Sequence, residues 1–420
     1  MNKILIITYY WPPGAGAGVQ RWLKFAKYLP EYGFEPVILT VDPGYAAYPF
    51  PDPSLEREIP QSLKVYKTPA YDFFRLFSKD KSRVPAAGFA TGKDTTLKGR
   101  FLRFIRGNFF IPDPRRGWNR YAFRKACEIT ETEKISRVIT TSPPHSTQLI
   151  GLRLKKRYPG IKWIADLRDP WTDIYYYDKF YPLWPARTLD AYYEKRTLRS
   201  ADRIITVGKS LKKLFVSKVP DSGIKTEVIH NGYDPEDFTG ISASVNDTFT
   251  VSYIGTLSDA YPLTGLLDAL NLFSATGRDF RLRFVGSVTP EQTLMIKSSV
   301  TAARAEFVPY ANHNDAIRFM LESSVLLLII PDDPGNKCII TGKLFEYLAT
   351  GRPILCLGPA DGDAAEIIKE TGHGAVLQYY DSAAIFKYLD GVFEDPVGSQ
   401  KVSYERFSRK RLAGELASML

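Results

Sequence analysis

The fold can be read first from the stretch between Lys3 and Thr40, which is KILIITYYWPPGAGAGVQRWLKFAKYLPEYGFEPVILT. It contains an apolar run, a loop rich in glycine and proline, an amphipathic segment and a second apolar run. We expect a strand over its first six residues, a helix over 19–32 that ends at Gly33, and a second strand over 36–40. A strand, a helix and a parallel strand form one right-handed crossover unit. The sequence thus predicts a parallel sheet covered by helices.

The same alternation continues along the rest of the chain. A less regular region, rich in Pro, Gly and aromatic residues, runs from Asp42 to about Pro114, and we expect it to form an insertion over one face of the first sheet. Further helices are expected at 121–132, 147–158, 187–200 and 210–218, and further strands at 137–141, 162–167, 203–207 and 226–229. A second series of strands is expected at 248–254, 280–285, 325–330 and 354–357. This pattern predicts an α/β fold with two doubly wound, Rossmann-like domains that face a cleft.

A run of turn residues from His230 to Pro235, HNGYDP, interrupts this alternation and marks the expected domain boundary. We expect an N-terminal domain over 1–232 and a C-terminal domain over 233–402. The last residues, 403–420, are predicted to form a helix that packs back on the N-terminal domain. Two domains also fit the length of 420 residues, because one core rarely keeps growing to that size.

Composition and charge limit the class of protein. The net charge of +10 indicates an acidic partner, such as a phosphorylated substrate, an anionic membrane or a nucleic acid. Apolar runs such as Val325–Ile330 are far shorter than the roughly 20 residues that span a bilayer, and the start of the chain does not resemble a secretion signal. A cytoplasmic location is therefore expected. The three cysteines are too widely spaced for a disulfide framework or a zinc site, so no metal is expected.

Basic and aromatic residues interleave between Lys98 and Arg124. Arginines stand at 100, 103, 106, 115, 116, 120 and 124, among Phe101, Phe104, Phe109, Phe110 and Trp118. Such a segment suits an interfacial helix whose rings enter lipid while its arginines meet head groups. It suits equally an amphipathic helix packed on its own domain. The segment contains no recognised nucleic-acid module, so nucleic acid is not expected as a partner.

The loop after the first strand, Tyr9–Gly18, has the sequence YYWPPGAGAG. Glycines at 14, 16 and 18 would let backbone amides approach a phosphate or a sugar, and Arg21 adds a cation in the first turn of the following helix. The spacing departs from the G-x-G-x-x-G of dinucleotide sites. Asp42 after the second strand nevertheless keeps the dinucleotide alternative open.

Polar residues follow two neighbouring strands of the first predicted sheet. One loop is SPPHS at 142–146, and the next is DLRDPW at 166–171. Because the carboxyl ends of parallel strands meet at one edge of a sheet, we expect His145, Arg168 and Asp169 to converge near the glycine loop. This arrangement would suit a hydroxyl acceptor and makes the three residues catalytic candidates. His145 suits a structural role equally well, and Asp166 could instead brace the loop.

In the second domain, glycine directly follows a strand at Gly255 and Gly286, which permits the close approach of a ligand. The segment Thr341–Leu357, TGKLFEYLATGRPILCL, predicts a short helix, a glycine stop and a buried strand. Lys343 in the first helical turn is unfavourable unless an anion such as phosphate binds beside it, because free amides already make that end positive. Glu346 has mostly apolar neighbours and needs a partner. The alternative is a simple Lys343–Glu346 pair at i, i+3 spacing.

Taken together, four motifs resemble glycosyltransferase family 4. They are YYWPPGAGAGVQR, VIHNGYD, YIGTL and GKLFEYLATGRPI, at 9–21, 228–234, 253–257 and 342–354. The resemblance covers almost the whole chain and implies the two-domain GT-B fold. It implies transfer of a sugar from a UDP- or GDP-linked donor to a hydroxyl acceptor, with retention and without a metal. It also implies that the second domain holds the nucleotide and the first the acceptor.

The resemblance also assigns roles to single positions, and this chain departs from the family at several of them. Glu346 matches the second glutamate of the family's paired motif, which binds donor ribose hydroxyls. The first glutamate would fall at Cys338 and is absent. Members commonly carry an arginine after the glycine of the YIGTL motif and a lysine a few residues on, where this chain has Thr256 and Leu263.

We therefore expect Lys343, helped by Arg21 or Arg168, to supply the positive charge at the diphosphate. Asp332 or Asp333 is expected to replace the missing carboxylate toward the donor sugar. The complete set of expected donor-binding residues is Lys343, Glu346, Gly342, Gly255, Thr256, Gly286, Gly16, Gly18 and Arg21. The expected catalytic residues are His145, Asp169 and Arg168.

Many members of this family act on lipid-linked sugars. The resemblance thus implies that segment 98–124 contacts the inner face of the membrane, and that the acceptor is a lipid-linked or cell-surface polysaccharide precursor. Two alternatives are a nucleotide-sugar epimerase on the same fold and a basic, non-enzymatic protein that binds nucleic acid or membrane. An epimerase would convert the donor without an acceptor. The non-enzymatic protein would show salt-dependent binding and no turnover.

Overall fold

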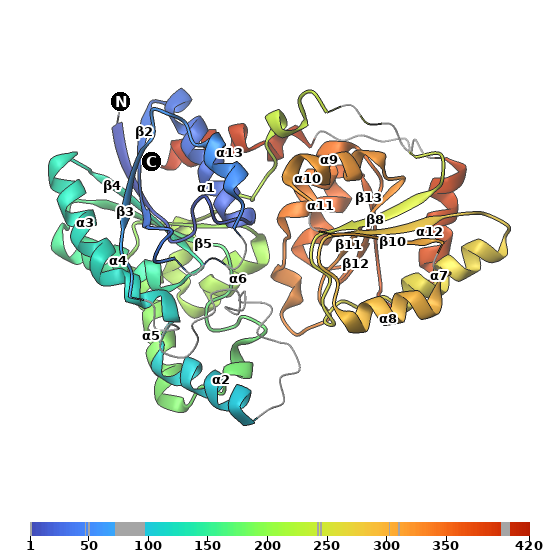
Figure 1. Cartoon of the computed structure of the whole chain (residues 1–420). Helices are drawn as coiled ribbons and strands as arrows, with labels where there is room; N and C mark the ends of the chain where they lie inside the picture. The colour runs from blue at the N-terminus through green and yellow to red at the C-terminus, as the bar shows by residue number, and fades with distance from the viewer. Residues whose placement is uncertain are drawn as a thin grey trace. The chain divides into compact units, whose positions relative to one another are not determined.

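The computed structural model describes residues 2–46, 48, 51–71, 97–241, 243, 246–301, 303–309, 311–395 and 404–420. The chain forms two compact units (Figure 1). The first contains Met1–Asn231 together with Arg409–Leu420, and the second contains Gly232–Ser408. Within the described residues, no helix combines the length and the apolar character that a bilayer crossing requires.

The described part of the first unit is built on a seven-stranded parallel sheet in the order β3-β2-β1-β4-β5-β6-β7. Its strands are β1 (Asn2–Ile7), β2 (Phe34–Val41), β3 (Lys64–Thr68), β4 (Arg137–Ser142), β5 (Lys162–Leu167), β6 (Arg203–Thr206) and β7 (Thr226–Val228). The strand order reverses between β1 and β4, the place where open α/β sheets bind their ligands. The predicted doubly wound domain is confirmed.

Helices cover both faces of this sheet. The helices of the described part of this unit are α1 (Ala17–Tyr28), α2 (Leu97–Phe109), α3 (Asn119–Thr132), α4 (Ser146–Arg157), α5 (Trp184–Ser200), α6 (Lys209–Lys218) and α13 (Arg409–Met419), of which α2 packs on α5. Side chains alternate along β1, so Ile4 and Ile6 pack with α1 and α13, whereas Leu5 and Ile7 pack with α3 and α4. Burial on both faces explains why the central strands read as continuous apolar runs.

The first helix is shorter than the sequence predicted. It ends at Tyr28, and the 3₁₀ turn η1 (Leu29–Tyr32) leads from there to Gly33. Pro30 has no amide hydrogen to continue the α-helical ladder, which explains the early end. The predicted stop at Gly33 is confirmed, since this residue has the left-handed φ of 84° that glycine adopts without strain.

The predicted irregular region between Asp42 and Pro114 is wrong in part. Residues 64–68 form the strand β3, which lies at the edge of the sheet and pairs in parallel with β2 from Val37↔Lys64 to Val41↔Thr68. The sequence KVYKT lacks an apolar run because an edge strand is only partly covered, so the pattern that found the central strands missed it. Residues 72–96 of the region lie outside the described residues, and α2 follows them.

The C-terminal helix α13 is part of the first unit. Its Leu412 and Leu416 are buried in the core beside α1. The chain end is held as well, because Arg137 Nε donates a hydrogen bond of 2.6 Å to the carbonyl of Leu420, and Lys162 Nζ donates one of 2.7 Å to the carbonyl of Met419.

The second unit contains a six-stranded parallel sheet in the order β10-β9-β8-β11-β12-β13. Its strands are β8 (Thr250–Ile254), β9 (Arg281–Val285), β10 (Ala305–Val308), β11 (Val325–Ile329), β12 (Ile354–Leu357) and β13 (Gly374–Leu377). Its helices are α7 (Thr264–Ala275), α8 (Pro290–Ser299), α9 (His313–Glu322), α10 (Gly342–Thr350), α11 (Asp363–Thr371) and α12 (Ser382–Glu394). The four predicted central strands are confirmed. The edge strands β10 and β13 were not predicted, since their residues are all partly exposed.

Two cores sandwich the second sheet. Val251 and Tyr253 pack with α7, α8 and α12 on one face, and Leu326 and Leu328 pack with α9, α10 and α11 on the other. The strand order reverses between β8 and β11. The loops after β8 and β11, together with the start of α10, are therefore the places in this unit where a ligand is expected.

Candidate functional site

Two glycines follow the central strands of the second unit. Gly255 comes after β8 with a φ of 125°, and Gly286 comes after β9 with a φ of 120°. A Cβ on Gly286 would lie 2.5 Å from the carbonyl oxygen of Gly255, and a Cβ on Gly255 would lie 2.5 Å from Nζ of Lys343. Neither position has room for a side chain. The two loops and the lysine at the start of α10 therefore pack directly on one another.

Lys343 is the second residue of α10 and is half-buried. Its Nζ donates a hydrogen bond of 3.1 Å to the hydroxyl of Tyr253 and lies 4.3 Å from the centre of that ring. The Tyr253 hydroxyl in turn donates to the carbonyl of Thr256 at 2.7 Å. Burial lowers the pKa of Lys343 to about 8, while Glu346 acts in the opposite direction. The cation is thus partly desolvated and held by neutral groups.

The simple ion pair between Lys343 and Glu346 is not formed. Among the described residues, Glu346 makes neither an ion pair nor a hydrogen bond with Lys343. Glu346 is half-buried, while its neighbours Phe345 and Tyr347 are in the core. The structure therefore leaves a lysine and a glutamate one helical turn apart on α10, neither neutralised by the other.

The loop after β11 carries the position where the family has its first glutamate. Cys338 ends the 3₁₀ turn η10 (Asn336–Cys338), and its thiol lies 3.2 Å from the carbonyl of Gly335. Asp332 is exposed and Asp333 is half-buried in the same loop. A contact of either aspartate with a donor sugar stays a prediction.

The glycine loop of the first unit divides into an open part and a closed part. Gly16 precedes α1 with a φ of 112°, and a Cβ there would meet nothing within 4 Å. A Cβ on Gly18 would collide with the guanidinium group of Arg168. The backbone at Gly16 is consequently accessible to a ligand, whereas Gly18 is needed so that Arg168 can lie against the loop.

Arg21 does not have the surroundings expected of a donor-binding residue. It is fully buried, donates a hydrogen bond of 2.5 Å to the carbonyl of His230, and lies 3.4 Å from a carboxylate oxygen of Asp166. Asp166 also accepts hydrogen bonds from Trp22 Nε1 at 2.8 Å and from the Thr141 hydroxyl at 2.7 Å. A buried carboxylate requires such partners. Asp166 therefore braces the loops, and Arg21 is one of its counter-charges with no surface free for a ligand.

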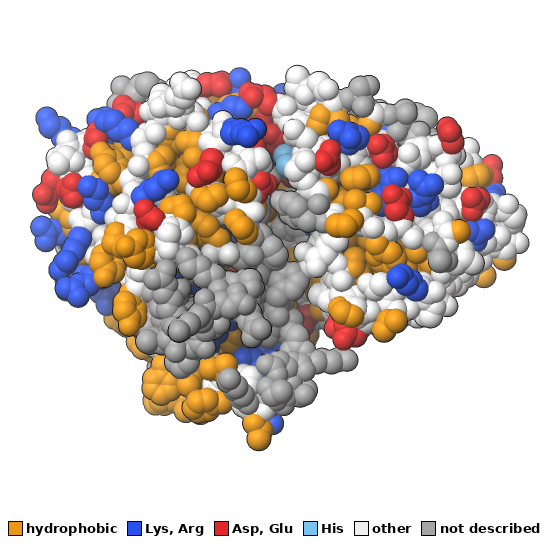
Figure 2. All heavy atoms as spheres, viewed as in Figure 1, with side chains coloured by type: hydrophobic (Ala, Val, Ile, Leu, Met, Phe, Trp, Pro, Cys, Tyr) orange, Lys and Arg blue, Asp and Glu red, His pale blue; other side chains and the backbone are white. Residues whose placement is uncertain are grey.

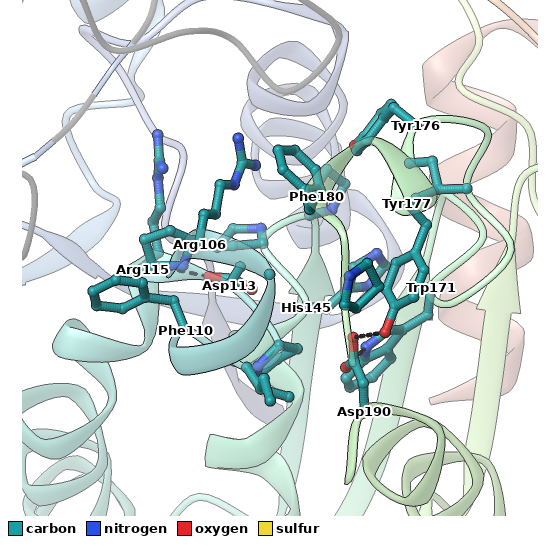
Figure 3. A pocket seen from close by; sticks show the side chains of 18 of the residues that line it. Arg106, Phe110, Asp113, Arg115, His145, Trp171, Tyr176, Tyr177, Phe180 and Asp190 are labelled. Carbon is teal, nitrogen blue, oxygen red and sulfur yellow. Dashed lines mark hydrogen bonds between the residues drawn. The ribbon is translucent and has the colours of Figure 1, made fainter. Parts of the chain in front are cut away.

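A cavity of about 110 Å³ lies beside these loops, within the first unit (Figure 3). α2 closes one side, where Gly107 packs so tightly on the backbone of Phe180 that a Cβ would not fit. The aromatic part of the wall is formed by Tyr10, Phe110, Trp171, Tyr176, Tyr177 and Phe180. The ionisable part is formed by Arg106, Asp113, Arg115, His145 and Asp190. An apolar wall with a few polar groups is typical of a small-molecule site.

His145 is the predicted residue that reaches this cavity. Its ring stacks on Trp171, with centroids 4.7 Å apart and planes inclined by 14°. Burial lowers the pKa of His145 to about 3, although a backbone hydrogen bond at Pro170 acts to raise it. The imidazole is therefore neutral at pH 7 and weak as a base. Arg168 and Asp169 lie close by but do not line the cavity, and a catalytic role for the three stays a prediction.

Sequence reasoning missed Asp190 as a cavity residue. It lies on α5, and its carboxylate accepts hydrogen bonds from Trp171 Nε1 at 2.6 Å and from the Tyr177 hydroxyl at 3.0 Å (Figure 3). Burial raises the pKa of Asp190 to about 7. The sequence around it, RTLDAYYEKR, is polar on all sides and contains no signal for a buried acid.

The segment 98–124 has two faces, one packed on the first unit and one exposed, and its contact with a membrane stays a prediction. Trp118 is 1% exposed, and Arg106 lies over the ring of Phe180 with Cζ 3.9 Å from the centroid. These side chains pack on their own unit. In contrast, Phe101 is 61% and Phe109 69% exposed on α2. A membrane contact would therefore involve the outer face of α2 and not its arginine at 106.

A family profile described as Glycosyltransferase Family 4 matches residues 18–237, just over half of the chain. The chain belongs to glycosyltransferase family 4. Members of this retaining family take their sugar from a nucleotide donor, so the protein is a nucleotide-sugar glycosyltransferase. No curated protein matches the sequence of this glycosyltransferase.

Solved structures match the glycosyltransferase over its whole length. HepE from Anabaena in complex with UDP has a TM-score of 0.62 at 13% identity, covering 100% of this chain and 99% of that one. Sucrose-phosphate synthase from Thermosynechococcus elongatus has 0.60 at 15% identity, covering 100% and 95%. A protein assigned as UDP-N-acetylglucosamine 2-epimerase from Listeria monocytogenes has 0.57 at 12% identity, covering 99% and 94%. At such identities the likeness shows the fold alone, and that fold is GT-B.

Proposed function

We propose that this glycosyltransferase binds the diphosphate of a UDP-linked sugar at the start of α10 and transfers the sugar to a hydroxyl of a lipid-linked or cell-surface polysaccharide precursor. The observation that supports the donor site is Lys343, half-buried beside Gly255 and hydrogen-bonded only to the neutral Tyr253 among the described residues. Burial without a carboxylate partner is costly for a cation unless a ligand supplies the negative charge.

The surroundings of Lys343 favour a diphosphate as that ligand. The start of α10 attracts anions through the amides of Gly342 and Lys343, whereas the Leu344 amide donates to the carbonyl of Thr341 at 3.2 Å. Gly255 and Gly286 let the two loops pack directly on each other and on Lys343, which holds the cation at the ends of β8 and β9. In the leaving nucleoside diphosphate the negative charge grows as the sugar departs, and a fixed lysine beside a helix N-terminus stabilises that charge.

Glu346 is assigned to the ribose of the same donor. It lies one turn after Lys343 and therefore on the same side of α10. An ionised carboxylate has acceptor sites for two hydroxyl groups, which is what a ribose presents. The complex of HepE with UDP supports uridine as the base, although a GDP-linked donor would satisfy the same phosphate contacts.

The lipid-linked acceptor is supported by an apolar patch on the first unit, which we call the α2–α5 patch. Its exposed residues are Leu97, Phe101, Phe109, Tyr181, Leu183 and Trp184. Asn108 joins α2 to the start of α5, because its side chain hydrogen-bonds the carbonyl of Tyr181 at 3.0 Å and the amide of Leu183 at 2.7 Å. Figure 2 shows hydrophobic side chains gathered at this end of the unit.

A membrane surface is the occupant that fits the α2–α5 patch. Trp184 is 77% exposed and Leu97 is 83% exposed. Single exposed apolar side chains are ordinary, but a group of them on one surface marks an interaction site. Exposed Arg100 adds a cation on α2, in a protein whose net charge is +10. Rings that enter the lipid interface beside cations that meet anionic head groups are typical of peripheral membrane proteins.

The test of the proposed function is a panel of UDP- and GDP-linked sugars, each incubated with the full chain and a membrane lipid extract. Release of nucleoside diphosphate with label in lipid, dependent on one donor, is the expected result. Conversion of the donor to an isomer without any acceptor would instead identify an epimerase. Absence of turnover and of UDP binding, with salt-dependent binding to nucleic acid, would refute the proposed function.

A further inference from the structure

Two arginines, Arg106 and Arg115, line the cavity of the first unit together with two aspartates, Asp113 and Asp190. Arg106 lies over the Phe180 ring and, among the described residues, makes no ion pair or hydrogen bond. Burial, followed by the nearby charge of Arg115, lowers the pKa of Arg106 to about 10. The guanidinium nevertheless stays protonated at neutral pH. Both arginines are half-buried, and an anion that lies close to the two guanidinium groups would relieve their mutual repulsion.

Arg115 is the second cation of this wall. Burial lowers the pKa of Arg115, but Tyr10, Tyr9 and Asp113 together raise it by more. In Figure 3 the guanidinium groups of Arg106 and Arg115 extend in the same direction, away from Asp113. The two charges are close enough for Arg115 to lower the pKa of Arg106.

Asp113 is held by hydrogen bonds to other groups than the guanidinium of Arg106. One of its carboxylate oxygens accepts hydrogen bonds from the Arg115 amide and the Ser146 hydroxyl, each at 2.9 Å, and the other accepts from the Ser146 amide at 2.7 Å. These bonds hold the carboxylate at the starts of η6 (Pro114–Trp118) and α4. Asp113 thus joins two loops by their backbone, and it makes no ion pair with the side chain of Arg106.

The opposite wall suits neutral hydroxyl groups. Trp171, His145 and Asp190 lie together on the side away from the two arginines (Figure 3). Within the described part of the chain, the buried Nδ1 of His145 has no hydrogen-bond partner. A neutral imidazole can exchange a hydrogen bond with a hydroxyl, and an aromatic wall beside it can cover the face of a sugar ring.

We propose that this cavity selects an acceptor whose terminal sugar carries a phosphate or a carboxylate, with the anion between Arg106 and Arg115 and the ring against Trp171 and His145. Arginine is suited to both anions, because its planar group offers paired donors to two oxygens at once. The cavity volume is about 110 Å³, and one internal water occupies about 10–15 Å³ on the same scale. The cavity therefore has room for a phosphate or carboxylate group. This inference rests on the proposed function in assuming that the first unit holds the acceptor.

The test compares the binding of four probes to the full chain saturated with UDP: glucose 1-phosphate, glucuronate, dodecyl phosphate and methyl glucoside. Anionic sugars are expected to bind at least tenfold more tightly than methyl glucoside, and the Arg106→Gln variant is expected to lose that difference. The first two probes separate phosphate from carboxylate, and dodecyl phosphate tests whether a lipid phosphate suffices. The matched control is Arg120→Gln, which removes an exposed arginine of α3 and should bind each probe within twofold of the unaltered protein.

Two further measurements make the outcome decisive. UDP binding should be the same in Arg106→Gln and in the unaltered protein, which shows that the variant is folded. Loss of anion binding in Lys343→Ala but not in Arg106→Gln would place the anions at the donor site and overturn the inference, as would equal binding of charged and neutral sugars. Failure of UDP to bind the unaltered chain would instead count against the proposed donor site.

Discussion

Lys343 Nζ lies 3.1 Å from the hydroxyl of Tyr253 and 4.3 Å from the centre of its ring, at a point where a Cβ on Gly255 would be 2.5 Å away. Tyr253 belongs to β8, and Lys343 belongs to α10. The contact therefore fixes the start of the helix against the end of a central strand. It also orients the cation without neutralising it, because the phenol is uncharged and burial raises its pKa.

Replacement of Lys343 by alanine should lower turnover by an order of magnitude or more and weaken UDP binding to a similar extent. The reason is that the variant loses the charge that stabilises the leaving diphosphate. Turnover and a calorimetric dissociation constant for UDP are the measurements. The matched control is Lys387→Ala, an exposed lysine of α12 in the same unit, which should behave as the unaltered protein. Near-normal UDP affinity in Lys343→Ala would remove this residue from the donor site.

The affinity for UDP should fall as the pH rises through about 8. The pKa of Lys343 in the free protein is about 8, chiefly because of burial, so the side chain is charged below that pH and increasingly neutral above it. A bound diphosphate stabilises the charged form, so binding above pH 8 must take up a proton. Titrations between pH 6.5 and pH 9.5, in two buffers with different ionisation enthalpies, would detect that proton. The Lys343→Arg variant should show no such fall, whereas a flat profile in the unaltered protein would contradict the prediction.

Glu346→Gln should also reduce turnover at least tenfold while leaving the fold intact. Glutamine keeps the size of the side chain but offers the ribose only one acceptor oxygen and no charge. The informative measurement is the affinity for UDP against that for inorganic pyrophosphate, because only the nucleotide contains the ribose. Glu346→Gln should weaken UDP and spare pyrophosphate. The control Glu291→Gln, at an exposed position of α8, should change neither.

The α2–α5 patch should mediate binding to anionic vesicles. The double variant Phe101→Ser, Trp184→Ser removes two exposed rings, and it is expected to lower the affinity for phosphatidylglycerol vesicles at least tenfold. A sedimentation assay at two salt concentrations measures this. Leu294→Ser provides the comparison, because this residue of α8 is also exposed, at 70%, but lies in the second unit. An equal loss of vesicle affinity in both variants would mean that any exposed apolar side chain contributes, and that the α2–α5 patch is not a specific membrane contact.

The sequence predicted the central strands because burial on both faces forces an apolar run, as in Val325–Ile329. It predicted that His145 lies at a strand end, because strand ends follow from the strands themselves. It could not predict that Arg106 lines the cavity. That placement depends on the close packing of Gly107 against Phe180, which are 73 residues apart in the chain, and helical periodicity does not encode such a contact. Sequence periodicity alone therefore does not separate the inward arginine from the outward-facing rings.

The final prediction concerns stability and the carboxyl of Asp190. Its pKa is raised from 3.8 to about 7, chiefly by burial and further by the charges of Asp113 and Glu194, although Trp171 and Tyr177 donate hydrogen bonds to it. Between these two values the folded protein holds a proton that the unfolded chain releases. The free energy of unfolding should therefore fall as the pH rises from about 4 to about 7, and stay low above that range.

Asp190→Asn cannot ionise and should not show this fall. Relative to the unaltered protein, the variant should gain about 3 kcal/mol in free energy of unfolding between pH 5 and pH 8, because the change spans about two pKa units and one unit corresponds to roughly 1.4 kcal/mol. His145 has a pKa lowered to about 3 and acts in the opposite direction over part of this range, but its contribution is common to both proteins and cancels in the difference. Urea denaturation at the two pH values measures the gain. Asp268→Asn, at an exposed position of α7, should show none, and an equal difference at both pH values would mean that Asp190 is already ionised at pH 5.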